Sequence, residues 1–177
     1  NDISASDALI SATNADSGIH YGDTKHAAQN AWSSVGSMDN DAFRAADGEM
    51  VTRADMTLGG AKVSVSLGDD TNLTTATPPG TETDYMSLGI TGTAGAFTYA
   101  LAAQNANTAW LDNDDNTAAS QLSTTGVRVS TTWGGATVAL GHSTNNNGGS
   151  TGVEVSYPMG ALTTTASYVA EDATGAK

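Results

Sequence analysis

The fold of this chain is decided by one stretch, residues 126–141, which reads GVRVSTTWGGATVALG. On either side of a turn at 134–136, apolar residues alternate with hydroxyl-bearing or charged ones. Such alternation is typical of a β-strand whose two faces meet different surroundings. Glycine supplies the positive φ that a tight hairpin turn requires. The stretch therefore predicts an antiparallel hairpin, with Val129 on one face of the sheet and Arg128 on the other.

The same Gly-Ala turn recurs at 59–61, 95–96 and 160–161, each time between two alternating runs. Longer connections rich in Asp, Asn, Thr and Gly separate these hairpins, at 69–83, 105–120 and 144–150. Short turns at one end of a sheet and long polar loops at the other describe an up-and-down meander. From Gly48 onward eight strands are expected, at 48–58, 61–68, 84–93, 96–104, 121–133, 136–143, 151–157 and 161–170.

Residues 1–47 differ from the rest of the chain. They are polar, lack sustained period-2 alternation and contain two stretches rich in Ala and Ser, at 4–13 and 25–35. Those stretches could be short helices or parts of a compact loop. The chain therefore divides into a loop-like segment, 1–47, and an array of hairpins, 48–177.

Charged side chains mark one face of the expected sheet. All the charges within the alternating runs fall on the face that carries Ser and Thr, at Arg53, Asp55, Lys62, Arg128 and Glu154. A cation facing the middle of a bilayer costs about 2–4 kcal/mol, so a membrane barrel must place its charges on the other side. The opposite face is built of Ala, Val, Leu, Met and Thr. We therefore expect the apolar face to contact lipid and the charged face to contact water.

Aromatic residues support this assignment. On the apolar face, Phe97, Trp133 and Tyr157 lie beside the short turns, and Tyr168 lies toward the other end of its strand. Outer-membrane barrels carry such aromatic girdles at the depth of the lipid headgroups. Strands of about 9–11 residues also match the length that a tilted strand needs to cross the hydrocarbon layer.

The composition argues against several classes of function. Asp and Glu outnumber Lys and Arg by 19 to 6, which gives a formal net charge of −13. An acidic chain repels phosphate backbones, so nucleic acid is not an expected partner. The chain has no Cys, which excludes Cys nucleophiles and zinc sites built on Cys.

The hairpins at 51–68, 86–104, 126–141 and 153–172 resemble the wall hairpins of general outer-membrane porins of the alphaproteobacterial type. The opening segment, with ASDAL at 5–9 followed by an acidic stretch, resembles the third external loop of that family, which folds inward and narrows the channel. The resemblance covers nearly the whole chain. It implies an all-β, antiparallel, up-and-down transmembrane β-barrel, with 1–47 as the inward-folded constriction loop and 48–177 as barrel wall.

Two departures of this sequence from the family pattern limit which properties the resemblance implies. A family member has sixteen strands and ends in an aromatic residue, whereas eight strands are expected here and the sequence stops at Lys177. We therefore expect this chain to be an internal portion of a longer barrel. The Pro-Glu-Phe-Gly-Gly loop motif of enteric porins is absent, so no residue roles are transferred from that branch.

The resemblance implies a passive, water-filled channel for small polar solutes and ions, and not an enzyme, in the outer membrane of a Gram-negative bacterium. Its implied partners are the lipid bilayer, lipopolysaccharide and further copies of the chain in a homotrimer. It also implies a constriction in which acidic loop residues face basic wall residues across water, creating a transverse field. The candidate constriction and lumen residues are Asp23, Asp39, Asp41, Arg44, Asp47, Glu49, Arg53, Asp55, Lys62, Arg128 and Glu154.

Two other functions fit parts of the pattern. A soluble cell-surface β-sheet module for adhesion or binding would also alternate and use glycine turns. An outer-membrane barrel hydrolase would need a His near an acid or a Ser, and the chain offers His20, His26 and His142, which lack the spacing of a zinc-binding helix. The stretch GGSTG at 148–152 spells a nucleophile elbow but leads into a strand instead of a helix.

No cofactor is expected, apart from adventitious Ca²⁺ at acidic loops. The stretch DNDDN at 112–116 begins like a calcium-binding loop. Thr117 stands where such a loop requires Gly, and no Glu follows at the twelfth position. A solvated external loop is therefore the better interpretation of this stretch.

Overall fold

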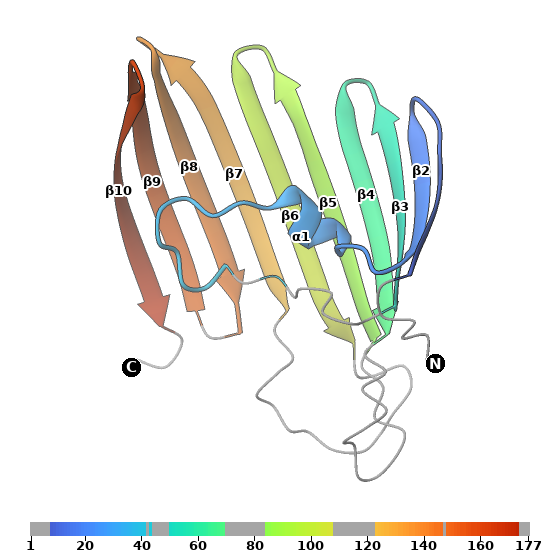
Figure 1. Ribbon diagram of the computed structural model, residues 1–177. Coiled ribbons are helices and arrows are strands. Elements are labelled where there is room, and N and C mark those ends of the chain that lie inside the picture. The colour runs from blue at the N-terminus through green and yellow to red at the C-terminus, as the bar shows by residue number, and fades with distance from the viewer. Residues whose placement is uncertain are drawn as a thin grey trace, which may run out of the picture.

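The computed structural model describes residues 8–41, 43, 50–69, 84–107, 123–146 and 148–173. Its strands form one antiparallel sheet in which each strand pairs with its neighbours in chain order (Figure 1). This confirms the expected all-β, up-and-down architecture. The strands are β1 Leu9–Thr13, β2 Ser17–Gly22, β3 Met50–Leu58, β4 Ala61–Asp69, β5 Asp84–Ala94, β6 Phe97–Asn107, β7 Thr124–Trp133, β8 Ala136–Asn145, β9 Gly148–Met159 and β10 Leu162–Ala173.

The Gly-Ala turns are hairpin turns as expected. They join β3 to β4, β5 to β6, β7 to β8 and β9 to β10, and each contains a glycine with positive φ. The values are 57° at Gly59, 62° at Gly95, 60° at Gly134 and 64° at Gly160. Only glycine adopts this conformation without a steric penalty, so these turns set the register of the four hairpins.

The eight strands expected from Gly48 onward are present as β3 to β10, but two more strands lie inside 1–47, where the sequence indicated a loop or short helices. That part of the expectation was wrong, and the sheet in the described residues has ten strands. In β2, Ile19 and Tyr21 alternate with His20, but the run is too short to stand out. The turn before it is closed by the Asn14 side chain, whose Oδ1 accepts hydrogen bonds from the Asp16 and Ser17 amides at 2.9 and 2.8 Å. A turn of this kind lacks the Gly-Ala signature. One short helix, α1 Ala27–Ala31, does fall within 25–35.

The connection expected at 144–150 is mostly strand. β8 extends to Asn145 and β9 begins at Gly148, and these two residues pair with each other. The GGSTG stretch therefore lies in β9 and forms no nucleophile elbow. An Asn- and Gly-rich composition indicates a loop, and here the ladder of backbone hydrogen bonds overrides it. The connections expected at 69–83 and 105–120 fall largely outside the described residues.

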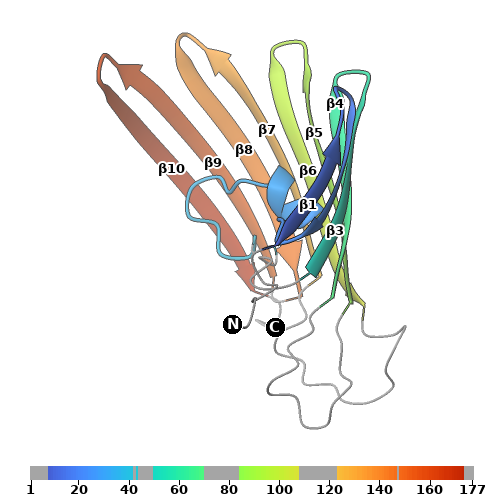
Figure 2. The same ribbon diagram turned by 45° about the vertical axis from the view of Figure 1, so that its right-hand side comes forward.

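The two faces of the sheet meet different surroundings. Figures 1 and 2 show a curved sheet, with α1 and the chain that follows it lying across one side. We call this side the inner face and the other the outer face. On the outer face Val65 is 49% exposed and Val155 is 40% exposed. No second layer covers the outer face within the described part of the chain, whereas a soluble β-sandwich would bury these positions.

The buried residues gather where the crossing chain meets the inner face. Val35 and Met38 of that chain form a small apolar cluster with Ala139 of β8. Ala27 and Ala28 of α1 are fully buried as well. None of the helices in the described ranges is both long and apolar enough to span a membrane. The core therefore serves to hold one segment against the sheet.

Candidate functional site

The segment 23–41, called the crossing segment below, runs over the inner face from β4 to β10. Near its start His26 lies against Gly68 of β4, and farther on Trp32 lies against Gly126 of β7. Gly36 then reaches Ser167 of β10. The segment thus spans most of the sheet.

Glycines in the strands make this close approach feasible. At one glycine in each of five strands, a Cβ would lie 2.2 to 2.7 Å from an atom of the crossing segment. We call these five residues the glycine track: Gly68, Gly89, Gly126, Gly141 and Gly152. A glycine inside a strand weakens the strand, so it often marks a place where another segment approaches the backbone. The sequence analysis missed these residues, although glycine at inward strand positions was a readable signal.

Serine hydroxyls of the wall hold the first half of the crossing segment. The Ala27 amide donates to Ser66 Oγ at 2.9 Å, and the Ala28 amide donates to Ser87 Oγ at 3.1 Å. The two hydroxyls lie 2.7 Å apart and are buried. Amides at the start of a helix have no partner within the helix, and α1 has no side-chain cap. The wall therefore supplies the capping acceptors, which fixes α1 in place.

Carboxylates hold the second half. The Gly36 amide donates to Glu154 Oε2 at 3.2 Å. The Asp39 amide and the Asn40 side-chain amide donate to the two oxygens of Glu171 at 3.1 and 3.0 Å. The Ser150 hydroxyl also donates to Glu171, and it accepts from the Asn40 amide at 2.8 Å. Hydrogen bonds to an ionised acceptor are stronger than those between neutral groups, so this end of the segment is held against β9 and β10. We call this set of hydrogen bonds the latch.

Replacing Glu171 with Gln is expected to loosen this latch. Glu171 is exposed, so solvent screens its charge and each hydrogen bond to it contributes about 1 kcal/mol. Hydrogen exchange at the Asp39 and Asn40 amides should therefore become about fivefold faster or more, because each 1.4 kcal/mol is tenfold in an equilibrium. The matched control is Asp172→Asn, one residue away on the outer face, which should leave both exchange rates unchanged. Equal rates in the Glu171 variant and the parent would contradict the latch.

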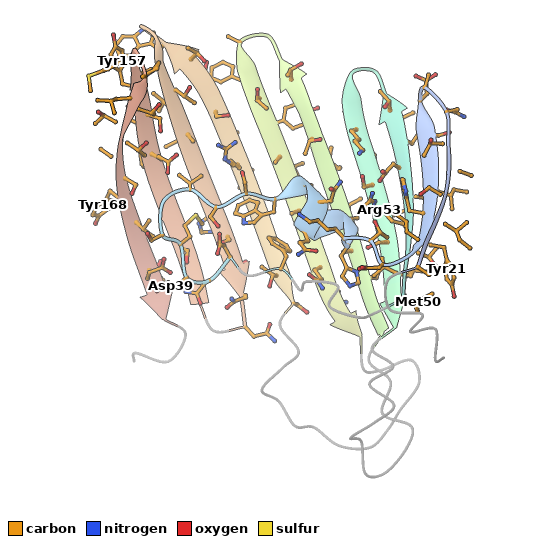
Figure 3. All side chains as sticks on the ribbon, in the orientation of Figure 1. Tyr21, Asp39, Met50, Arg53, Tyr157 and Tyr168 are labelled. Atoms are coloured by element: carbon orange, nitrogen blue, oxygen red, sulfur yellow. The ribbon has the colours of Figure 1, made fainter. Side chains whose placement is uncertain are left out.

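A compact charged cluster lies on the inner face of β2 to β4. Asp55 is its centre, with Arg53 Nε at 3.1 Å, Lys62 Nζ at 3.4 Å and His20 Nε2 at 3.4 Å. Arg53 also donates from Nη1 to the Lys25 carbonyl at 2.8 Å, which ties the cluster to the crossing segment. A recess of about 380 Å³ lies beside the cluster, between it and the β1–β2 turn. Figure 3 labels Arg53 among these side chains.

The other expected constriction residues occupy varied positions. The Asp41 carboxylate accepts hydrogen bonds from Trp32 Nε1, at 3.1 Å, and from the Ser34 hydroxyl, so it folds the crossing segment upon itself. Asp23 and Asp39 are exposed. Arg128 is partly buried on β7, with Nη1 3.4 Å from Ser130 Oγ. The remaining candidates lie outside the described residues: Arg44, Asp47 and Glu49.

The expected girdle residues are on the outer face. Phe97, Trp133 and Tyr157 lie within two residues of the ends of β6, β7 and β9 at the short turns, and all are exposed. Tyr168 is exposed in the middle of β10, where it pairs with Val153, and not toward the far end of its strand as expected, because β10 continues to Ala173. Figure 3 shows Tyr157 near the turn and Tyr168 farther along the sheet.

The three histidines do not come together at one site, although His20 lies 3.4 Å from Asp55. His142 lies on the outer face, 2.9 Å from Thr151 Oγ1, so the sheet separates it from His20 and His26. His26 Nδ1 lies 3.4 Å from Ser66 Oγ, but both residues are buried and that hydroxyl is engaged by the Ala27 amide. No cluster of three metal-ligating side chains occurs within the described residues, and the stretch 112–116 lies outside them.

Comparisons with known proteins bear on the fold. No protein-family model and no curated protein sequence matches the chain. Among solved structures, a triple mutant of the porin from Rhodopseudomonas blastica is similar, with a TM-score of 0.66 and 17% sequence identity. The match covers 96% of this chain and 63% of that porin, so the chain spans less than two thirds of its length. At this identity the likeness shows the fold alone, which is that of a porin-type barrel wall.

Proposed function

We propose that this chain forms wall and constriction of an outer-membrane porin, a water-filled channel for passive diffusion of small hydrophilic solutes and ions. The porin-type fold supports the proposal at the level of architecture. The observation that supports the functional part of the proposal is that the two faces of the sheet differ in chemistry, since one is apolar and the other is polar and charged. A pore needs one face for lipid and one for water.

The outer face suits lipid. Among the side chains that the structure describes on β3 to β10, the outward positions carry no Lys or Arg, and their one carboxylate is Asp172 near the end of β10. Large apolar side chains are exposed there, including Leu67 at 60% and Met86 at 59%. Exposed apolar surface of this extent marks a membrane or protein contact.

The edge of the apolar band runs obliquely across the sheet. The register row that contains Leu67 and Met86 reaches polar Asn105 on β6. A row farther along, which contains Leu101 and Val127, stays apolar until it reaches His142 on β8. Strands of a barrel tilt by about 35–45°, so a level membrane surface crosses register rows at an angle. A slanting boundary is therefore what a tilted membrane barrel requires.

The inner face supplies the channel. The crossing segment narrows the lumen and lies between two groups of charges of unlike composition. The cations Arg53 and Lys62 lie on β3 and β4, and the carboxylates Glu154 and Glu171 lie on β9 and β10. Charges separated in this way orient water and polar solutes across the channel. The sequence analysis placed the acids on the loop and the bases on the wall, whereas the described side chains favour a field between two parts of the wall.

The proposal also includes the membrane and the oligomeric state of the channel. The apolar outer face would contact lipid and lipopolysaccharide in the outer membrane of a Gram-negative bacterium. A homotrimer follows from the resemblance to general porins, and analytical ultracentrifugation in detergent tests it directly. A monomeric mass there would remove the trimer from the proposal and leave the channel intact.

Reconstitution into a planar bilayer tests the channel itself. The full-length protein should partition into detergent and produce stepwise increases in conductance. A soluble adhesion module would stay in the aqueous phase and produce no steps. A hydrolase would lose activity when His20, His26 and His142 are replaced together, whereas the channel should keep most of its conductance.

A further inference from the structure

We infer that the outer face carries a binding site for one acyl chain of a membrane lipid, an inference that rests on the proposed pore function. The site is a groove of about 800 Å³ that crosses β3 to β7. Each of these strands pairs with a neighbour on both sides, so the groove does not arise at an open edge of the sheet. A bilayer contacts the whole outer face of a pore, whereas this groove would hold one chain in a fixed place.

Two neighbouring register rows of outward side chains form the sides of the groove. One row contains Thr52, Leu67, Met86 and Asn105, and the other contains Ala54, Val65, Leu88, Ala103 and Thr125. Between the rows, Ser66 and Ser87 turn their side chains to α1 on the inner face, so their backbone forms the floor. The surface of the groove is almost entirely apolar. A long apolar groove of this shape matches an extended hydrocarbon chain.

The two ends of the groove differ in polarity. At β3 it ends beside Ala54, and at β6 and β7 it ends beside Asn105, Ser123 and Thr125. The Ser123 hydroxyl donates to Asn105 Oδ1 at 2.7 Å, which engages the amide oxygen and leaves the amide nitrogen to donate to another acceptor. The acyl chain of a lipid begins at a carbonyl group, which is such an acceptor. We therefore place this carbonyl at Asn105 and the hydrocarbon along the two rows toward β3.

The direction of the groove agrees with the depth of the membrane. Because the strands of a barrel tilt by about 35–45°, a register row passes obliquely through the bilayer. The row is apolar at Leu67 on β4 and Met86 on β5, and it becomes polar at Asn105 on β6. The polar end of the groove therefore lies at the membrane surface and the apolar end lies in the hydrocarbon layer. An acyl chain below its headgroup has the same orientation.

An acyl chain suits the groove better than a second copy of the protein does. A second copy would present a broad sheet surface, which would bridge the groove and leave it unfilled. Among the described residues that line the groove none is charged, so the groove offers no ion pair to a protein partner. A flexible hydrocarbon chain needs only apolar contact and can follow the floor between the two rows.

Native mass spectrometry tests the site, with full-length protein extracted from phosphatidylethanolamine vesicles into a mild detergent. The parent should retain one phosphatidylethanolamine after the other lipids have been washed away. Ala54→Phe combined with Ala103→Phe fills the groove with two rings and should lower the retained fraction by about tenfold or more, which corresponds to about 1.4 kcal/mol. The matched control is Ala94→Phe combined with Ala166→Phe, which adds the same rings elsewhere on the outer face and should leave retention unchanged.

Asn105→Leu tests the polar end of the groove without adding bulk. Asn105 is exposed near the end of β6, so the substitution should leave the sheet intact. The variant loses the hydrogen-bond donor at the proposed carbonyl position and should retain about fivefold less lipid than the parent. Conductance steps from each variant would show that it has folded and inserted.

The outcomes separate this inference from the function on which it rests. Absence of conductance steps from the parent would overturn the pore and the lipid site with it. Steps from a parent that retains no lipid would overturn the site and leave the pore standing. Equal retention by the parent and the filled-groove variant would place the lipid elsewhere on the outer face and contradict the inference. A lower oligomeric mass of the filled-groove variant would assign the groove to a second copy of the protein and contradict it as well.

Discussion

Replacing Gly89 and Gly152 together with Val is expected to lift the crossing segment off the wall. A Cβ at either position would lie 2.3 Å from a backbone oxygen, that of Ala27 for Gly89 and that of Val35 for Gly152. Backbone atoms cannot move aside as a flexible side chain can, so the segment itself must shift. Overpacking of this kind costs about 1–3 kcal/mol at each site. The hydrogen bonds to Ser66 and Ser87 would be lost with it.

Limited trypsin digestion measures the release. Cleavage after Lys25, whose carbonyl is held by Arg53, should become about tenfold faster or more, because each 1.4 kcal/mol is tenfold in the opening equilibrium. Single-channel current should also lose its fixed level and fluctuate. Ala94→Val combined with Ala170→Val adds similar bulk on the outer face and should change neither quantity. Unaltered cleavage and a steady current in the glycine variant would contradict the observed docking.

A lysine at Val155 is expected to prevent insertion, and a lysine at the next residue is expected to be tolerated. Val155 lies on the outer face of β9 between Val138 and Ala166. A Lys at this position would face acyl chains, at a cost of about 2–4 kcal/mol near the midplane. Ser156 faces the opposite side, where its hydroxyl lies 2.9 Å from Thr165 Oγ1. A Lys there would extend into water beside Glu154.

Folding into lipid vesicles, followed by the shift of the folded band on gels, compares the two variants. Val155→Lys should lower the free energy of unfolding by about 2–4 kcal/mol, and Ser156→Lys by less than about 1 kcal/mol. In a soluble single-layer sheet, with Val155 40% exposed as it is here, both positions would lie at a water-accessible surface and would tolerate Lys equally. Equal effects would therefore favour the adhesion module over the channel.

Local signals made most of the sheet predictable. The four glycine turns and the alternation beside them defined the hairpins from β3 to β10, because turn chemistry and side-chain period are properties of neighbouring residues. The face assignment of Arg53, Lys62 and Glu154 followed from the same period. The β1–β2 hairpin was not predicted, because an Asn14 side chain closes its turn and its strands are short.

The site was less predictable because it is made by contacts distant in sequence. Gly36 meets Glu154, and Asp39 meets Glu171, across more than a hundred residues. The local sequence around one residue of such a pair does not indicate which distant residue it will contact. Arg53 illustrates the difference, since the sequence shows a wall cation and only the fold shows that a backbone carbonyl and Asp55 bind it. The glycines at inward strand positions were the one feature of the sequence that could have predicted a segment docked against the sheet.

A single-cysteine scan through residues 127–132 of β7, in protein reconstituted into lipid vesicles, tests the central claim that the outer face contacts acyl chains and the inner face contacts channel water. The chain has no native Cys, so each label reports one position. At positions 128, 130 and 132 a charged, water-soluble maleimide should react, whereas at 127, 129 and 131 a fluorophore should be quenched by brominated acyl chains. Uniform reactivity along the strand, or quenching without alternation, would contradict the claim.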